Sequence, residues 1–359
     1  MSLTIIIIAL CLYAASGLPG LLINRHTRTG QYLATGMAVL GSILGLLGSG
    51  MILTTGSIWT LQYAWTIPVG SMYLSVDSLS AFFLVSIFVI GGLGSVYGQE
   101  YWKQNEHPEN GRKLRLFYGL LIAGMGLVVL ARDGVLFLIA WELMALSAYF
   151  LITTEDDKPE VCEAGWIYLI ATHTGTLCLF ALFSLLNKVS GSFSLVPLMA
   201  AQLSPVLAGV IFVLALVGFG FKAGIMPLHF WLPGAHANAP SHVSATLSGV
   251  MIKMGIYGLI RIYSLIPNPP ISWGGIILGL GVISSLVGVM YAIGQHDLKR
   301  LLAYHSIENI GIILMGLGLA MLGRSMNHPD WIFLGMAGCL LHVWNHGIFK
   351  SLLFFSAGS

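Results

Sequence analysis

The sequence predicts an all-α, polytopic membrane protein with about eleven transmembrane helices, the seventh of which is broken. Only 8% of the 359 residues are charged and 57% are hydrophobic, with a mean hydropathy of +0.87. A soluble domain carries about 25% charged residues, so a soluble protein is excluded. Apolar stretches of about 20 residues, enough to cross ~30 Å of hydrocarbon, recur along the whole chain. Pro227, Pro233 and Pro240 interrupt one region, as is typical of a helix that unwinds at membrane depth.

The apolar stretches are separated by short polar connections, and each predicts one crossing of the membrane. We expect spans near 3–23, 31–54, 77–98, 114–131, 133–153, 164–187, 206–235 (broken at Pro227), 241–263, 272–294, 301–323 and 331–357. Between the second and third spans, Trp59, Tyr63, Trp65 and Tyr73 fit an aromatic belt at the membrane–water interface.

The distribution of basic residues predicts the orientation. If the N-terminus lies outside, nine lysines and arginines fall in inside loops and only four in outside loops, which agrees with the positive-inside rule. The nine are Arg25, Arg28, Lys103, Arg112, Lys113, Arg115, Lys158, Lys299 and Arg300, and the four are Arg132, Lys188, Arg261 and Arg324. We therefore expect a multi-pass protein of the cell inner (plasma) membrane with its N-terminus outside. No basic segment precedes the first span, which favours a helix over a cleaved signal peptide, although Ala14-Ala15-Ser16 leaves the alternative open.

Three lysines and a carboxylate lie deep inside predicted spans. Lys222, Lys253 and Lys350 are the remaining basic residues, and Glu142 lies near the middle of the fifth span. A charged group at the bilayer centre costs at least ~2.5–3.5 kcal/mol, so such groups usually face a bundle interior or a hydrated path. Lys222, beside the predicted break, is the natural partner of Glu142. The pair could serve only to specify helix packing, but a broken helix and further titratable groups nearby favour ion movement.

Histidines continue this pattern between the lysines. Lys222, His229 and His236 follow one another at seven-residue spacing, and His242 and Lys253 are eleven apart, so each set can share a helix face. Any one of these histidines could be a satisfied core group. The alternation of lysines and histidines nevertheless predicts a chain of groups that exchange protons.

The last span carries a second line of bases. His342, His346 and Lys350 are each four residues apart, a stripe of about 12 Å along a helix. An H-x-x-x-H pair can bind a metal, but no carboxylate or thiolate stands at ligand spacing, so proton transfer is favoured and no metal is expected. His305 and Glu308, near the inner end of the tenth span, are candidates for proton access or relay, or else a solvated helix end.

Other polar residues need no functional explanation. Asp77 and Asp133 open helices and are expected N-caps, and His173 has no partner that the sequence identifies. The four cysteines lie far apart without a C-x-x-C pair, so they supply no disulfide framework and no iron–sulfur site. No cofactor is expected in this chain.

Four segments carry a family resemblance: WELMALSAYFLI, GFKAGIMPLHFWLPGAHANAPSHVSATLSGVMIKMGIYGLIR, HDLKRLLAYHSIENIG and HVWNHGIFKSLLFFSAG. In these segments the chain resembles the proton-translocating antiporter-like subunits of respiratory complex I, Mrp antiporters and membrane-bound hydrogenases. The similarity extends over most of residues 75–359. WELMALSAYF and SIENIG look most like the branch of hydrogenase-4 component B and formate hydrogenlyase subunit 3.

The resemblance implies roles for the residues that match the family's motifs. Glu142 and Lys222 would form the pair that gates proton uptake, and Lys253 would be the central lysine. The remaining positions of the implied path are His229, His236, His342, His346 and Lys350. Complex I relatives often carry a histidine where this chain has Asn309, so a relay there would use His305, Glu308 or water.

The resemblance also implies a single membrane domain, 1–359, built as an inverted-repeat bundle. N-terminal helices 1–113 would precede a first repeat at 114–263, and a second repeat, 272–359, would be incomplete, because family members continue into a second broken helix.

The function implied is that of a proton-translocating membrane subunit of a hydrogenase or NADH–quinone-type redox complex. Its partners would be other membrane subunits and, indirectly, peripheral redox subunits that provide the energy, since this chain has no redox centre of its own. Any enzymatic activity would then belong to the complex. Two alternatives stay open: an Mrp-type sodium/proton antiporter subunit, and a passive membrane scaffold for a hydrogenase arm. Sodium prefers oxygen ligands, whereas the deep groups here are mostly nitrogen bases.

Overall fold

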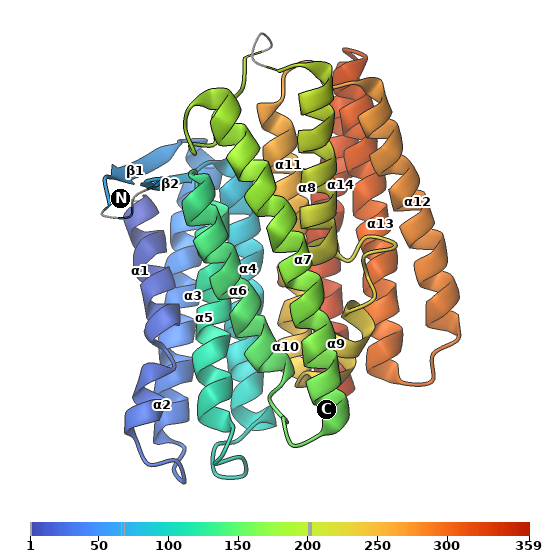
Figure 1. Cartoon of the computed structure of the whole chain (residues 1–359). Coiled ribbons are helices and arrows are strands. Elements are labelled where there is room, and N and C mark those ends of the chain that lie inside the picture. The colour runs from blue at the N-terminus through green and yellow to red at the C-terminus, as the bar shows by residue number, and fades with distance from the viewer. Residues whose placement is uncertain (1, 66, 68, 200–202) are drawn as a thin grey trace.

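The computed structural model describes residues 2–65, 67, 69–199 and 203–359 and is a bundle of long helices lying side by side (Figure 1). Eleven helical segments in the described part are long and apolar enough to cross a membrane, which confirms the predicted architecture. The elements are α1 (Ser2–Ala15), α2 (Leu18–Leu22), α3 (Thr29–Thr55), β1 (Trp59–Tyr63), β2 (Met72–Val76), α4 (Ser78–Tyr101), α5 (Gly111–Leu130), α6 (Gly134–Ile152), α7 (Pro159–Ser190), α8 (Pro205–Ala223), α9 (Leu232–Asn238), α10 (Ser241–Thr246), a π-helical turn (Leu247–Met251), α11 (Lys253–Leu265), α12 (Ile271–Ile293), α13 (Leu298–Ser325) and α14 (Pro329–Gly358).

Successive spans run in alternate directions, so the two ends of the bundle carry different loops. The loops at 23–28, 102–110, 153–158 and 294–297 share the lower end in Figure 1, with the C-terminus, while the N-terminus lies at the upper end. The basic residues that the sequence places inside therefore do gather at one end. Which way that end faces stays a prediction, as does the division into repeats.

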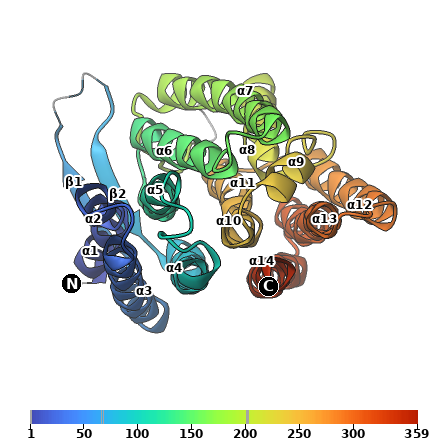
Figure 2. The same cartoon turned by 90° about the horizontal axis from the view of Figure 1, so that it is seen from below.

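Viewed along the helices, α1 to α3 form one edge of the bundle, and α12 and α13 the other (Figure 2). The last helix, α14, returns to pack against α13, α10 and α4. Ser351 on α14 donates to the carbonyl of Ala245 on α10 at 3.1 Å, and Tyr97 on α4 donates to the carbonyl of Phe355 at 2.9 Å. The C-terminal bases of α14 are thereby held against the segment that contains Lys253.

The broken helix ends earlier than its prolines suggest. α8 stops at Ala223, four residues before Pro227, because Gly224 adopts a left-handed conformation (φ +73°) that closes the helix in the usual C-terminal way. The chain is then non-helical until α9 begins at Leu232. A π-helical turn directly before Lys253 interrupts the following span a second time. The sequence thus predicts the break correctly and places it about one helical turn too late.

A β-hairpin joins α3 to α4 where the sequence predicts only interfacial aromatic residues. Strands β1 and β2 are antiparallel, with Trp59 opposite Val76, and the backbone N–H of Arg132 donates to the carbonyl of Tyr73 at 2.9 Å. The segment Trp59–Tyr63 alternates apolar and polar residues, which is the strand period, and that signal is overlooked when its aromatics are assigned to the interface.

The sixth span is also longer than predicted. α7 begins at Pro159 instead of near residue 164. Proline at the first helical position and Glu160 in the first turn are both favourable there, so the helix begins before the apolar stretch does.

The helices that carry Lys222 and Lys253 touch through their backbones. A Cβ atom on Gly255 of α11 would lie 2.5 Å from the carbonyl oxygen of Phe219 and 2.8 Å from the backbone nitrogen of Ala223 on α8. Only glycine permits this approach, which fixes α8 against α11 between the two lysines.

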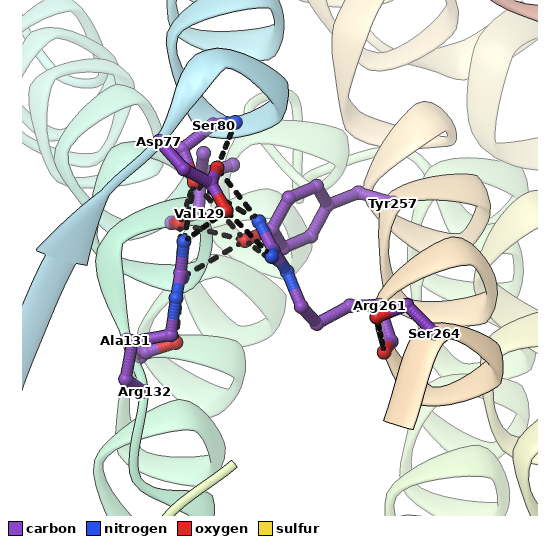
Figure 3. A network of polar contacts seen from close by, with 8 residues as sticks. All are labelled: Asp77, Ser80, Val129, Ala131, Arg132, Tyr257, Arg261 and Ser264. Atoms are coloured by element: carbon purple, nitrogen blue, oxygen red, sulfur yellow. Dashed lines mark hydrogen bonds and ion pairs between the residues drawn. The ribbon is translucent and has the colours of Figure 1, made fainter. Parts of the chain in front are cut away.

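An ion cluster ties α4, the α5–α6 turn and α11 together at the upper end of the bundle (Figure 3). Asp77 caps α4, as predicted, by accepting from the N–H of Ser80 at 2.8 Å. Its carboxylate also accepts from both terminal nitrogens of Arg261, at 2.7 and 3.0 Å, and lies 3.4 Å from Arg132. Burial alone would raise the pKa of Asp77, but the hydrogen bonds and charge of Arg261, the charge of Arg132 and the N–H of Ser80 together hold this pKa well below its ordinary value.

We expect Asp77→Asn to destabilise the protein at neutral pH, because asparagine still caps α4 but no longer pairs with Arg261. Breaking a buried ion pair costs about 3–5 kcal/mol, and since 24% of the Asp77 side chain is exposed we expect the lower part of that range. The pKa of Asp77 is lower in the folded protein than the ~3.9 of an unfolded chain, so this stabilisation is complete above about pH 4 and declines only as the pH falls below it.

The check is thermal stability in detergent between about pH 5 and pH 8, where the loss should not vary with pH. Asp133→Asn is the matched control, since Asp133 caps α6 and bonds to Ser71 without an arginine partner. Equal losses from the two variants would contradict the prediction.

Gly255→Ala should lower the melting temperature, because overpacking typically costs about 1–3 kcal/mol and the clashing atoms are backbone. Gly209→Ala on α8 is the control. A Cβ there meets nothing within 4 Å, so helix propensity alone predicts a gain of about 0.5–1 kcal/mol. A Gly255→Ala protein as stable as the wild type would contradict the backbone contact.

Candidate functional site

Lys222 lies in the last turn of α8, at the end where backbone carbonyls lack helical partners and favour a nearby cation. Its side chain is buried, with 2% of the residue exposed. The ammonium nitrogen donates to the hydroxyl of Tyr168 on α7 at 3.0 Å and stands 5.7 Å from the ring centroid of Trp141. The break in the helix thus creates a polar niche for one lysine inside the bundle.

Glu142 does not contact Lys222, and the predicted direct ion pair is wrong for the described residues. Glu142 instead pairs with His173 on α7, at 3.3 Å between Oε2 and Nε2, and its other oxygen is buried without a hydrogen-bond partner. The carboxylate still acts on Lys222 through its charge. Side-chain exposures of 26% for Glu142 and 46% for His173 place this pair at the side of the bundle.

Three histidines follow Lys222 along the chain, and each has at least one buried ring nitrogen without a hydrogen-bond partner in the described structure. His229 lies on the non-helical segment and is half-buried. His236 in α9 is fully buried, stacked on Phe354 of α14 with 5.4 Å between ring centroids. His242 in α10 packs against Tyr101 and Tyr118.

Lys253 begins α11 directly after the π-helical turn and is 1% exposed. Its ammonium nitrogen donates to the backbone carbonyl of Ser248, within that turn, at 2.6 Å. π-helical turns release carbonyls from the normal helical pattern and are frequent at functional sites. The second interruption therefore provides the hydrogen-bond acceptor for the second lysine.

The bases on α14 form a single stripe, as their spacing predicts. The rings of His342 and His346 are parallel with centroids 6.3 Å apart, and Lys350 is buried one turn further. His342 bonds through Nε2 to the side-chain oxygen of Asn309 at 2.8 Å. Both ring nitrogens of His346 are buried without a partner in the described structure.

The two groups of bases approach each other where α14 packs against α10 and the π-helical turn. The ring of His236 stacks on Phe354 of α14, and Ser351 of α14 donates to the carbonyl of Ala245, so His346 and Lys350 lie on the helix that faces Lys253 and His236. Lys253 and His236 are within the field of Lys350. No described hydrogen bond links Lys222 to His229 or His236.

The lower end of the bundle supplies further titratable groups. His305 and Glu308 are bonded to each other at 2.5 Å, and the charge of Glu308 reaches Lys350 and His342. Lys299 donates to the carbonyl of Ala239 at 2.8 Å and acts on His236. These groups lie between the basic lower end and the buried cluster.

Tyr168 was not identified from the sequence, and His173, Lys299 and Asn309 were noted there without a part in the site. Tyr168 and His173 lie one and a half turns apart in an apolar helix, and a polar residue at that depth is the signal that could have identified them. Within the described residues no group of three or more histidine, cysteine or acidic side chains is arranged to hold a metal ion.

Comparison with known proteins agrees with the architecture. Residues 131–359 match the family model described as NADH:quinone oxidoreductase/Mrp antiporter, transmembrane. The chain is 36% identical over 354 residues to hydrogenase-4 component B of Escherichia coli (strain K12), covering 98% of this chain and 52% of that protein. It is 35% identical over 334 residues to formate hydrogenlyase subunit 3 of the same organism, covering 90% and 52%. The chain thus spans about half the length of these relatives.

A solved structure has the same fold. The Mrp complex from Dietzia sp. DQ12-45-1b contains a chain that matches with a TM-score of 0.82 and 25% identity, over 98% of this chain and 37% of that one. The buried lysines and histidines are therefore set in a fold shared with that complex.

We predict that water occupies the cluster around His236, His346 and Lys253. A buried polar atom without a partner costs about 1–3 kcal/mol, so partnerless imidazole nitrogens are expected to hold ordered water. A high-resolution map of the full-length protein in lipid should show solvent density at hydrogen-bonding distance from both ring nitrogens of His346. Dry apolar packing around that ring would refute this prediction.

Proposed function

Since this chain belongs to the NADH:quinone oxidoreductase/Mrp antiporter family of membrane proteins, we propose that it moves protons as a membrane subunit of a hydrogenase or NADH–quinone-type redox complex. The observation that carries the proposal is the packing of α14, with His346 and Lys350 buried on it, against the segment that holds His236 and Lys253, with imidazole nitrogens that no described protein group satisfies. Imidazoles and buried lysines are suited to exchanging protons with water between them.

The proposed path follows the bases in space. A proton arrives at Lys222, crosses by water with His229 and His236 to Lys253, and passes to His346 and Lys350 on α14. His242 lies beside this path, and His305 with Glu308 gives an access point from the lower end. Each of these roles rests on placement and burial.

The interaction that we propose to control proton uptake at Lys222 differs from a simple ion pair with Glu142. Tyr168 holds the ammonium group of Lys222, while Glu142 acts from a distance and is itself bound to His173. An adjacent subunit that contacts the half-exposed Glu142–His173 pair could change the field at Lys222 without entering the bundle. Moving one charge against 100 mV requires ~2.3 kcal/mol, which is within reach of such a change.

The energy would come from partner subunits with redox centres, as the hydrogenase-4 and formate hydrogenlyase relatives suggest by their names. We place the protein in the cell inner membrane with the basic lower end inside and the N-terminus outside, following the positive-inside rule. Contacts with other membrane subunits are proposed to involve the half-exposed side of α6 and α7.

An Mrp-type sodium/proton antiporter is a second candidate, favoured by the shared fold with the Dietzia complex. The buried groups here are mainly nitrogen bases, and sodium prefers a cage of oxygen atoms. Sodium dependence of proton movement in vesicles distinguishes the two: its presence would favour the antiporter.

Lys253→Ala in the full-length protein, assembled with its partners, should slow proton translocation by about 10²-fold or more, the range for a positioned proton-transfer group. Proton uptake per electron is measured in membrane vesicles while the complex turns over. The control is Lys188→Ala, which removes an exposed lysine at the end of α7.

Unchanged proton uptake in an assembled Lys253→Ala complex would refute the proposal. That result would favour a passive scaffold with an idle polar interior.

A further inference from the structure

The face of α11 that carries Lys253 continues to the upper end of the bundle through Tyr257 and Arg261. These residues are spaced four apart, so Lys253 and Arg261 lie about 12 Å apart along the helix. Tyr257 is completely buried. A proton leaving Lys253 by the shortest route to the upper surface would have to pass this residue.

Every hydrogen-bonding position of the Tyr257 hydroxyl is occupied. Its hydrogen is donated to the carbonyl of Val129 at 2.8 Å. Its oxygen accepts from Arg132 at 3.1 Å and from Arg261 at 3.2 Å. A hydroxyl oxygen has two lone pairs, and both are therefore engaged by guanidinium N–H groups.

Ser80, the other hydroxyl in the cluster, has the same arrangement (Figure 3). It donates to the same carbonyl of Val129 at 3.0 Å and accepts from Arg132 at 2.7 Å and from Arg261 at 3.3 Å. The two hydroxyls lie 3.4 Å from each other and share the carbonyl of Val129, which also accepts from Arg132 at 3.0 Å. Each hydroxyl oxygen accepts from both guanidinium groups.

The two arginines that surround these hydroxyls, Arg132 and Arg261, cannot take part in proton transfer. Arginine cannot be deprotonated in proteins, so it neither accepts a proton nor releases one to a hydroxyl. Two guanidinium groups face the single carboxylate of Asp77, which leaves a net positive charge buried in the path and repels an incoming proton. The two-pronged contact of Asp77 with Arg261 prevents the guanidinium from turning away.

We propose that Asp77, Ser80, Arg132, Tyr257 and Arg261 form a proton seal that closes the upper end of the path beside Lys253. This inference rests on the proposed function. Protons that reach Lys253 then leave sideways, toward His346 and Lys350 on α14, and do not escape directly to the upper surface. With this seal in place, Lys253 can carry a proton without letting protons leak directly across the membrane.

Arg261→Gln tests the seal in the full-length protein assembled in native membrane vesicles. The substitution removes the net charge and frees a lone pair on each hydroxyl, yet leaves Asp77 paired with Arg132. With no electron donor present, an imposed pH gradient should decay about tenfold faster per assembled complex, a barrier lowered by ~1.4 kcal/mol. Arg132→Gln is a second variant that keeps the Asp77–Arg261 contact and should leak similarly.

Arg324→Gln is the matched control. Arg324 also lies at the upper end, but it bonds to the carbonyls of Tyr263 and Ile266 and not to the cluster, so its loss should leave the decay rate unchanged. Adding Lys253→Ala to Arg261→Gln should abolish the leak, because the leak passes through that lysine.

The proposal fails if assembled Arg261→Gln and Arg132→Gln complexes hold the gradient as well as the wild type, or if the leak persists without Lys253. Since the leak is measured without turnover, either outcome leaves the coupled translocation tested with Lys253→Ala unaffected. Conversely, a Lys253→Ala complex that still pumps would overturn the proposed function whatever the leak shows.

Discussion

Burial of nitrogen bases in a membrane-spanning bundle is the constraint on which the rest of this structure depends. A lysine or histidine removed from water must find a hydrogen-bond acceptor, a counter-charge or trapped solvent, because each unsatisfied polar atom costs about 1–3 kcal/mol. A regular α-helix offers no such acceptor, since its carbonyls are all used by its own backbone. Lys222 and Lys253 both lie where the helices of the bundle are irregular.

Both interruptions of the helices provide what a buried lysine needs. α8 ends at Gly224, so Lys222 lies in a terminal turn with free carbonyls and finds the hydroxyl of Tyr168. The π-helical turn before Lys253 leaves the carbonyl of Ser248 available to its ammonium group. For these two lysines, the irregular backbone and the buried ammonium group lie at the same place, whereas Lys350 is buried within the continuous helix α14.

Local and periodic features could be predicted from the sequence, whereas partners across the bundle could not. Span length and hydropathy identify eleven crossings, and the four-residue spacing of His342, His346 and Lys350 correctly predicts one face of α14. The break in α8 is placed at Pro227 because proline is the obvious signal, although the conformation of Gly224 ends the helix first.

The partner of a buried charge depends on the three-dimensional approach of distant segments. Asp77 is predicted correctly as a cap, an interaction within three residues, but its contact with Arg261 spans 184 positions. Glu142 and Lys222 have matching charges and depths, yet His173 lies closer to the carboxylate and Tyr168 closer to the ammonium group. Complementary charge alone does not decide pairing when hydroxyls and imidazoles compete.

Along one face of α11, the polar atoms near Lys253 and those near Tyr257 differ in how fully they are hydrogen-bonded. At the middle of the bundle, the bases around Lys253 include imidazole nitrogens without partners, and such atoms can gain or lose a proton through water. About one turn further along α11, the hydroxyl of Tyr257 is bonded by the carbonyl of Val129 and by two arginines, groups that do not titrate. A group that relays a proton needs a free lone pair, whereas a group that blocks protons has all its lone pairs occupied by hydrogen bonds. In the proposed scheme, this difference alone would direct protons away from the upper end, without a conformational change. In this scheme, α11 therefore carries both the proton-accepting Lys253 and, at Tyr257 and Arg261, part of the barrier that isolates it from one end of the bundle.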